Sequence, residues 1–137
     1  MRKSLAASIS AGVIVFASLA TASPASASAK VCGWGGDSSL GYWEVCYSVW
    51  GSGLYVDSVE GSARRTDGGP ARSIHFEYVK AGNVHWKNSQ QYWSNNQADW
   101  QNVKGNVSKA GDYCAKLWVE QNGGHYWAGQ ACVNIHL

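Results

Sequence analysis

Apolar and polar residues alternate in short runs in the last third of the chain. Two such runs, residues 112–120 (DYCAKLWVE) and 125–137 (HYWAGQACVNIHL), flank the segment Asn122-Gly123-Gly124. A period of two is that of a β-strand with one buried face, and asparagine with glycine between two such runs is typical of a hairpin turn. This pattern predicts a β-hairpin near the C-terminus.

The register of this hairpin follows from the length of its turn. With three residues in the turn, Gln121 lies opposite His125. Counting back from that pair brings Cys114 directly opposite Cys132. The same register predicts four more opposed pairs: Val119 with Trp127, Leu117 with Gly129, Ala115 with Ala131, and Tyr113 with Val133. One face is then almost wholly apolar and the other carries both cysteines, so we expect a Cys114–Cys132 disulfide.

Two more hairpins are predicted in the middle of the chain. They join residues 42–50 to 54–60 through Gly51-Ser52-Gly53, and residues 72–80 to 84–87 through Ala81-Gly82-Asn83. In the second hairpin we expect Tyr78 opposite Trp86 on the inward face. Glu77 is expected opposite Lys87 on the outward face, as a cross-strand ion pair. The two faces would carry Ile74, Phe76, Tyr78 and Trp86 inward, and His75, Glu77, His85 and Lys87 outward.

The rest of the chain follows the same plan of short strands between turn signals. No stretch has a helical pattern, and residues 62–71 (SARRTDGGPA) are predicted to form a polar loop. About seven strands at this spacing predict an all-β fold, a small antiparallel β-sandwich stapled by disulfides. A Greek-key strand order is an open alternative.

The N-terminus has the layout of a secretory signal peptide. Arg2 and Lys3 are followed by the uncharged run Leu5–Ala20 and by the small-residue triplet Ala27-Ser28-Ala29. We expect cleavage after Ala29, with Ala22 as the alternative site. Residues 30–137 would then be a single secreted, extracellular domain with no membrane span, and the signal has a bacterial character.

Four cysteines lie in the predicted mature domain. With Cys114 paired to Cys132, the remaining bridge is Cys32–Cys46, whose loop contains the turn-like segment Gly35–Ser39. A loop of this length contributes about 3 kcal/mol in the chain-entropy model. No C-x-x-C spacing occurs, so we expect disulfides and not a metal site.

The charge of the predicted mature domain disfavours anionic partners. Once Arg2 and Lys3 are removed, nine basic residues balance nine acidic ones, and no basic cluster remains. Neither nucleic acid nor an anionic membrane surface is therefore an expected partner. No cofactor-binding motif is present, and we expect no cofactor.

The sequence contains none of the common enzymatic motifs, and we expect that the protein is not an enzyme. One constellation is an alternative: Arg72, His75, Glu77 and His85 lie on one predicted hairpin, and acid–base cleavage of RNA needs such groups. Residues 74–79 (IHFEYV) are similar to the strand that carries a catalytic glutamate in small microbial ribonucleases. This similarity spans only those residues and assigns no site. The plainer interpretation is a surface Glu77–Lys87 pair with two bystander histidines.

Inhibition of a secreted hydrolase is another alternative. The layout of two disulfides, many strands and a signal peptide resembles that of secreted actinomycete inhibitors of proteases and amylases, and of their small carrier proteins. Arg64-Arg65 in the predicted loop would present a basic residue to a trypsin-like protease. No cysteine braces that loop, however, so we expect it to be a site of proteolytic nicking.

The surplus of aromatic residues indicates a binding protein. Eight tryptophans and seven tyrosines exceed the needs of a core of this size, and three tryptophans, Trp86, Trp93 and Trp100, recur among amides and serines. Trp86 has an inward assignment. The candidate binding residues are Trp93, Trp100, Tyr92 and Trp34. We expect a protein-interaction module or an accessory subunit of an extracellular assembly, whose ligand is an extracellular protein. The alternative is a carbohydrate-binding module that holds a glycan on exposed tryptophan and tyrosine rings.

Overall fold

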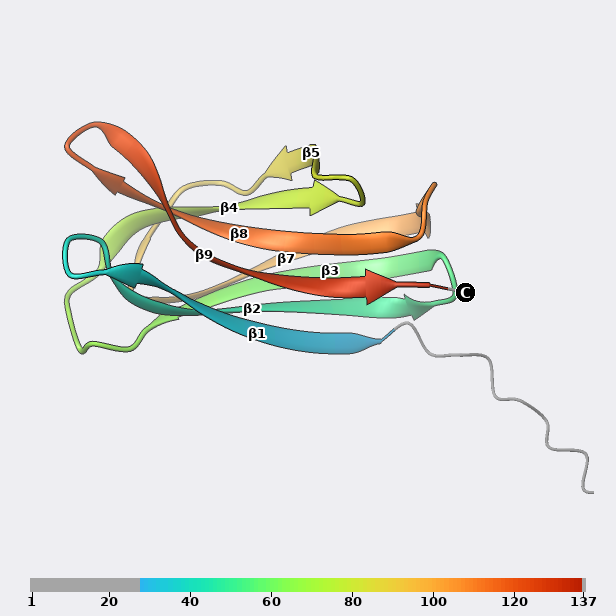
Figure 1. Ribbon diagram of the computed structural model, residues 1–137, viewed down its shortest axis with the longest axis horizontal. Coiled ribbons are helices and arrows are strands. Elements are labelled where there is room, and N and C mark those ends of the chain that lie inside the picture. The colour runs from blue at the N-terminus through green and yellow to red at the C-terminus, as the bar shows by residue number, and fades with distance from the viewer. Residues whose placement is uncertain (1–27, 137) are drawn as a thin grey trace, which may run out of the picture.

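A computed structural model describes residues 28–136 and confirms an all-β fold of two antiparallel sheets (Figure 1). It contains nine strands, where the sequence predicted about seven. They are β1 (Ala29–Asp37), β2 (Gly41–Ser52), β3 (Tyr55–Arg65), β4 (Arg72–Lys80), β5 (Val84–Asn88), β6 (Tyr92–Ser94), β7 (Asn96–Asn106), β8 (Gly111–Gln121) and β9 (Gly124–Ile135).

The strands divide into two sheets that pack face to face. Sheet A has the order β1-β2-β3-β7, and sheet B has the order β5-β4-β8-β9, with the short strand β6 also paired to β4. Strands β1 and β9 approach so closely that a Cβ at Gly33 would lie 2.2 Å from the carbonyl oxygen of Gln130. Glycine is therefore required at this crossing of β1 and β9.

The core follows the period-two pattern of the strands. The inward positions of β2 and β4 are fully buried: Trp43, Val45, Tyr47 and Val49 on β2, and Ile74, Phe76 and Tyr78 on β4. Alternation alone therefore separates the core residues of these strands from those on the outer faces.

The C-terminal hairpin confirms the predicted disulfide register but corrects the turn. The turn has two residues, Asn122 and Gly123, with φ of 50° and 79°, and Gln121 pairs with Gly124 in place of His125. Both positive φ values suit the Asn-Gly type I′ turn. A β-bulge that leaves Ala128 unpaired then restores the predicted register from Leu117 to Tyr113.

The shorter turn moves the residues between it and the bulge to the other face. Trp127 lies opposite Trp118, where the sequence predicted Val119, and His125 lies opposite Glu120. Both therefore belong to the outer face of sheet B, since a slip of one residue exchanges the faces.

The β4–β5 hairpin has the predicted loop, with Lys80 opposite Val84, but it also contains a bulge. Trp86 is unpaired, and Tyr78 lies opposite Lys87. The predicted Glu77–Lys87 pair is wrong: Lys87 Nζ donates to Gln101 Oε1 at 2.7 Å. Trp86 still packs against Tyr78, with ring centroids 6.1 Å apart.

Two turns and one loop lie further along the chain than the sequence predicted. Strand β1 continues through Asp37, and the turn covers residues 38–40, where Asp37 Oδ1 accepts hydrogen bonds from the amides of Ser39 and Leu40. In the β2–β3 hairpin, Ser52 pairs with Tyr55 across a turn at residues 53–54. Residues 62–65 of the predicted polar loop belong to β3, because all four pair with β2 and residues 62–64 also pair with β7.

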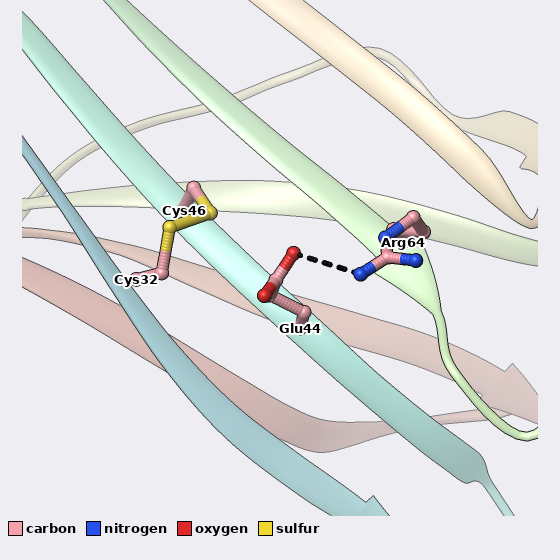
Figure 2. Close-up of a disulfide and its surroundings, with 4 residues drawn as sticks. All are labelled: Cys32, Glu44, Cys46 and Arg64. Atoms are coloured by element: carbon pink, nitrogen blue, oxygen red, sulfur yellow. Dashed lines mark hydrogen bonds and ion pairs between the residues drawn. A yellow bond between two sulfur atoms is a disulfide. The ribbon is translucent and has the colours of Figure 1, made fainter.

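Both predicted disulfides are present. Cys32 is bonded to Cys46 and Cys114 to Cys132, with Cα atoms 4.0 and 4.1 Å apart. Figure 2 shows the first bridge between β1 and β2, next to the ion pair of Arg64 Nη2 with Glu44 Oε1 at 3.4 Å. Each bridge therefore joins directly opposed residues of neighbouring strands on the outer face of its sheet.

The predicted signal peptide lies outside the described residues except for Ser28 and Ala29, and Ala29 is the first residue of β1. Between residues 28 and 136, no helix is long and apolar enough to cross a membrane.

Candidate functional site

The structure does not bring the four predicted binding residues into one patch. Trp34 on β1 and Trp100 on β7 lie on the outer face of sheet A, at its two opposite edges, and are 66% and 52% exposed. Trp93 on β6 lies on sheet B. The Tyr92 hydroxyl donates a hydrogen bond to Asp99 Oδ1, which turns that side chain inward.

Trp93 points outward because its neighbours in β6 and β4 fix the pairing. Ile74, which is fully buried, pairs with Tyr92, and Ser73 pairs with Trp93. Since successive side chains of a strand point to opposite faces, the anchored Tyr92 directs Trp93 to the outer face. Its side chain is 75% exposed.

Trp93 lines a hollow of about 640 Å³, here called the Trp93 hollow. The other lining residues are polar: Ser39, Arg72, Ser73, Glu120, Gln121 and Asn122. The Arg72 guanidinium donates hydrogen bonds to the carbonyl oxygens of Ser39 at 3.1 Å and Glu120 at 3.2 Å. These bonds tie the β1–β2 turn and the end of β8 to β4, so the walls of the hollow are held in place before any ligand binds.

A second hollow of about 420 Å³, the histidine hollow, lies on the same outer face. It is lined by His75, Glu77, Asn88, Ser89, Gln91, Trp118 and His125. Gln91 Nε2 lies 3.5 Å from Glu120 Oε2 of the Trp93 hollow, so the two hollows adjoin.

The histidine hollow contains a fixed carboxylate and a pair of imidazoles. Glu77 accepts a hydrogen bond from Trp118 Nε1 at 3.2 Å and lies 2.9 Å from His85 Nδ1. The rings of His75 and His125 meet edge to face, with centroids 5.0 Å apart. The Glu77 carboxylate is therefore already engaged on two sides.

Burial and charge shift the titration of this cluster. Partial burial lowers the pKa of His75, and the nearby His125 lowers it further, while Glu77 opposes both effects. For Glu77, burial by itself raises the pKa, but the hydrogen bonds from His85 and Trp118 outweigh it and the net shift is downward. We therefore expect a neutral His75 and an ionised Glu77 at neutral pH.

The residues considered for RNA cleavage are brought together only in part. His75 and Glu77 line the histidine hollow and His85 contacts Glu77, but Arg72 lines the other hollow. Neither a lysine nor an arginine is among the lining residues of the histidine hollow. The nearest cation on the paired strand is Lys116, which lies opposite Glu77 and donates to Asn83 Oδ1 at 3.1 Å.

Sequence reasoning missed Trp118 and His125 as members of this hollow. The sequence does contain a signal for Trp118, because its indole occupies a position between Lys116 and Glu120 on the polar face of the strand. The sequence gives no such signal for His125, because the predicted turn length assigned this residue to the apolar face. In the part of the chain that the structure covers, no three potential metal ligands group together.

Compared with models of protein families, with curated proteins and with solved structures, the chain matches none.

Proposed function

We propose that this protein is a non-catalytic binding protein whose ligand is a neutral glycan, held in the Trp93 hollow. The observation that carries the proposal is the Trp93 indole, three-quarters exposed at the edge of a hollow with otherwise polar walls. An aromatic ring offers a flat apolar surface for the C–H face of a sugar. Amides and hydroxyls beside it can bond the sugar hydroxyl groups.

The charge of the Trp93 hollow favours an uncharged ligand. Its lining contains one cation, Arg72, and one anion, Glu120, which balance each other. Arg72 is engaged with two carbonyl oxygens and is not free to bind a phosphate or carboxylate bidentately. A hydroxyl-rich neutral ligand satisfies such a surface without burying an unpaired charge.

The same lining supports binding without cleavage. Glycoside hydrolysis usually requires a pair of carboxylates on either side of the scissile bond. Of the residues that the structure describes, Glu120 is the only one that brings a carboxylate to the Trp93 hollow.

The test is affinity electrophoresis of residues 30–137 in gels that contain soluble polysaccharides, each tested separately. At least one neutral polysaccharide is expected to retard the wild-type protein, and Trp93→Ala should remove that retardation. Trp34→Ala is the matched control, since it deletes another largely exposed indole, from the other sheet. Equal retardation of both variants, or retardation by anionic polysaccharides alone, contradicts the proposal.

A protein partner is a second candidate, favoured by a different face. Trp50 and Trp100 form a ring pair on sheet A, with centroids 4.7 Å apart, and both are exposed. Paired aromatic side chains are frequent hot spots in protein interfaces. A pull-down from culture supernatant is expected to recover a stoichiometric protein with the wild type but not with Trp100→Ala. Recovery by both would exclude this surface as the interface.

We also propose that the protein acts outside the cell. Two disulfides, with every cysteine of the chain paired, suit an oxidising compartment, and the N-terminal pattern of a signal peptide agrees.

A further inference from the structure

A third hollow lies between the two sheets, at one end of the sandwich. Its walls are mostly apolar and come from both sheets, with Tyr47, Val56, Val59 and Val103 from sheet A and Trp86 and Ile135 from sheet B. Its volume is about 300 Å³. This size is at the lower end of the range of small-molecule pockets, which typically have mostly apolar walls and few polar groups.

The hollow exists because the backbone of β7 leaves room there. Gly105 lies opposite the buried Val56, and a Cβ at Gly105 would have only the carbonyl oxygen of Val103 nearby, at 3.9 Å. The pairing of β3 with β7 shifts register between Val56 and Ser58. Consequently Trp86 and Val103 pack against the core but stay partly exposed.

The charge of this hollow is positive and comes from a single lysine. Among the described residues that line it, Lys80 is the only charged one, beside the uncharged polar Asn106 and Ser108. Lys80 Nζ lies 6.0 Å from the centroid of the Trp86 ring. Within residues 28–136, Lys80 forms no ion pair with a carboxylate. A mostly apolar hollow with one cation at its wall and no carboxylate paired to it complements an apolar molecule with one anionic end.

We propose that this hollow binds a small amphiphilic carboxylate, such as a medium-chain fatty acid. The apolar tail lies against Trp86 and the valines, and the carboxylate pairs with Lys80. This site is separate from the Trp93 hollow, since the two share no lining residue, and it does not depend on the proposed glycan binding.

The experiment is calorimetric titration with decanoate, and with decanol as the uncharged analogue, both below their aggregation concentrations. Decanoate is expected to bind at one site, and decanol at least tenfold more weakly. Lys80→Gln should weaken decanoate at least tenfold and leave decanol unchanged. Lys30→Gln is the matched control, an exposed lysine on β1 outside the hollow, and should change neither.

A variant that fills the hollow tests the position of the tail. Gly105→Leu, which places a side chain in the empty space, should abolish binding of both ligands; Val103→Phe is the second filling variant if Gly105→Leu does not fold. Retardation by polysaccharide should persist in the filled variant, which separates the two sites. No binding of decanoate to the wild type, no effect of Lys80→Gln, or undiminished binding to the filled variant overturns the proposal.

Discussion

At the scale of single residues, the buried Asp99 on β7 connects sheet A to sheet B. It is 4% exposed, and its carboxylate accepts hydrogen bonds from the hydroxyls of Tyr78 and Tyr92 and from the amide of Gln101. A buried carboxylate is tolerated only when it is hydrogen-bonded in this way. The same bonds hold Tyr92 inward, and so they also orient Trp93 at the candidate site.

We expect Tyr78→Phe to destabilise the protein by about 1–3 kcal/mol, because a buried hydrogen-bonding group is left without its partner. The lost hydroxyl donates to Asp99 Oδ2 at 2.7 Å and accepts from the amide of Gly61 at 3.2 Å. Urea unfolding followed by tryptophan fluorescence measures the loss. Tyr42→Phe is the control, since Tyr42 is half exposed. An equal effect of the two substitutions would contradict this role of Asp99.

His75 is expected to make stability dependent on pH. Its pKa in the folded protein is lowered below the ordinary 6.5, so the folded state binds fewer protons than the unfolded state as the pH falls below 6.5. Stability contributed by neutral His75 is thus complete above pH 6.5 and is lost on acidification. The neighbouring groups that act on this titration are His125 and Glu77.

The measurement is the urea midpoint at pH 7 and pH 5 for wild type, His75→Gln and His136→Gln. The drop in midpoint on acidification should be smaller in His75→Gln than in the wild type. His136 is exposed near the end of the chain, so His136→Gln should keep the wild-type drop. If all three drop equally, His75 is not the group responsible.

At the scale of elements, the end of β3 shows that strand pairing can protect from proteolysis a segment whose sequence resembles an exposed loop. The sequence predicted a nicking site at Arg64-Arg65, but both residues belong to β3. Arg65 Nε donates to Asp67 Oδ1 at 2.6 Å, and Asp67 Oδ1 also accepts from the amide of Gly69 at 3.0 Å. The hydrogen bond from Arg65, followed by that from Gly69, lowers the pKa of Asp67 to about 2.

The folded protein is therefore expected to resist trypsin at Arg64 and Arg65, because a protease needs an extended segment that it can bind outside a sheet. Asp67→Asn should speed cleavage there by releasing the Arg65 guanidinium and the loop that follows. Cleavage products identified by mass spectrometry give the measurement. Asp57→Asn is the control, because Asp57 is an exposed residue of β3. Rapid cleavage of the wild type at these arginines would contradict the observed pairing.

The accuracy of the predicted strand pairing depended more on the length of the turns than on the pattern of the strands. Alternation assigned the inward residues of β4 correctly, because half-buried strands have only two faces. In the C-terminal hairpin the turn was one residue shorter than predicted, and the bulge at Ala128 restored the register further along. The disulfide position was therefore right, while His125 and Trp127 were assigned to the wrong face.

At the scale of the whole molecule, two disulfides support a small sandwich, one in each sheet, and each joins cysteines that lie directly opposite on neighbouring strands. The bonded cysteines are separated by 14 and 18 residues. Both hollows on the outer face of sheet B combine elements that are distant in the chain, such as β4 with the end of β8. Alternation within a strand says nothing about which strands become neighbours, so neither hollow could be derived from the sequence.

Removing either bridge by paired Cys→Ser substitution is expected to cost about 3 kcal/mol, because a closed loop of this length restricts the unfolded chain. The free energy of unfolding from urea titrations, compared with the oxidised wild type, gives the measurement. A cost below about 1 kcal/mol for both bridges would mean that they are not the supports of the fold.

The most direct test of the proposed function is an NMR titration that follows the indole N–H signals of the eight tryptophans. Oligosaccharides of a polysaccharide that retards the protein are added, and the Trp93 signal is identified by its loss in Trp93→Phe. The account predicts that the Trp93 signal shifts saturably, while the signals of Trp34 and Trp100 on sheet A stay in place. Saturable shifts confined to Trp34 or Trp100, with Trp93 unmoved, would contradict it.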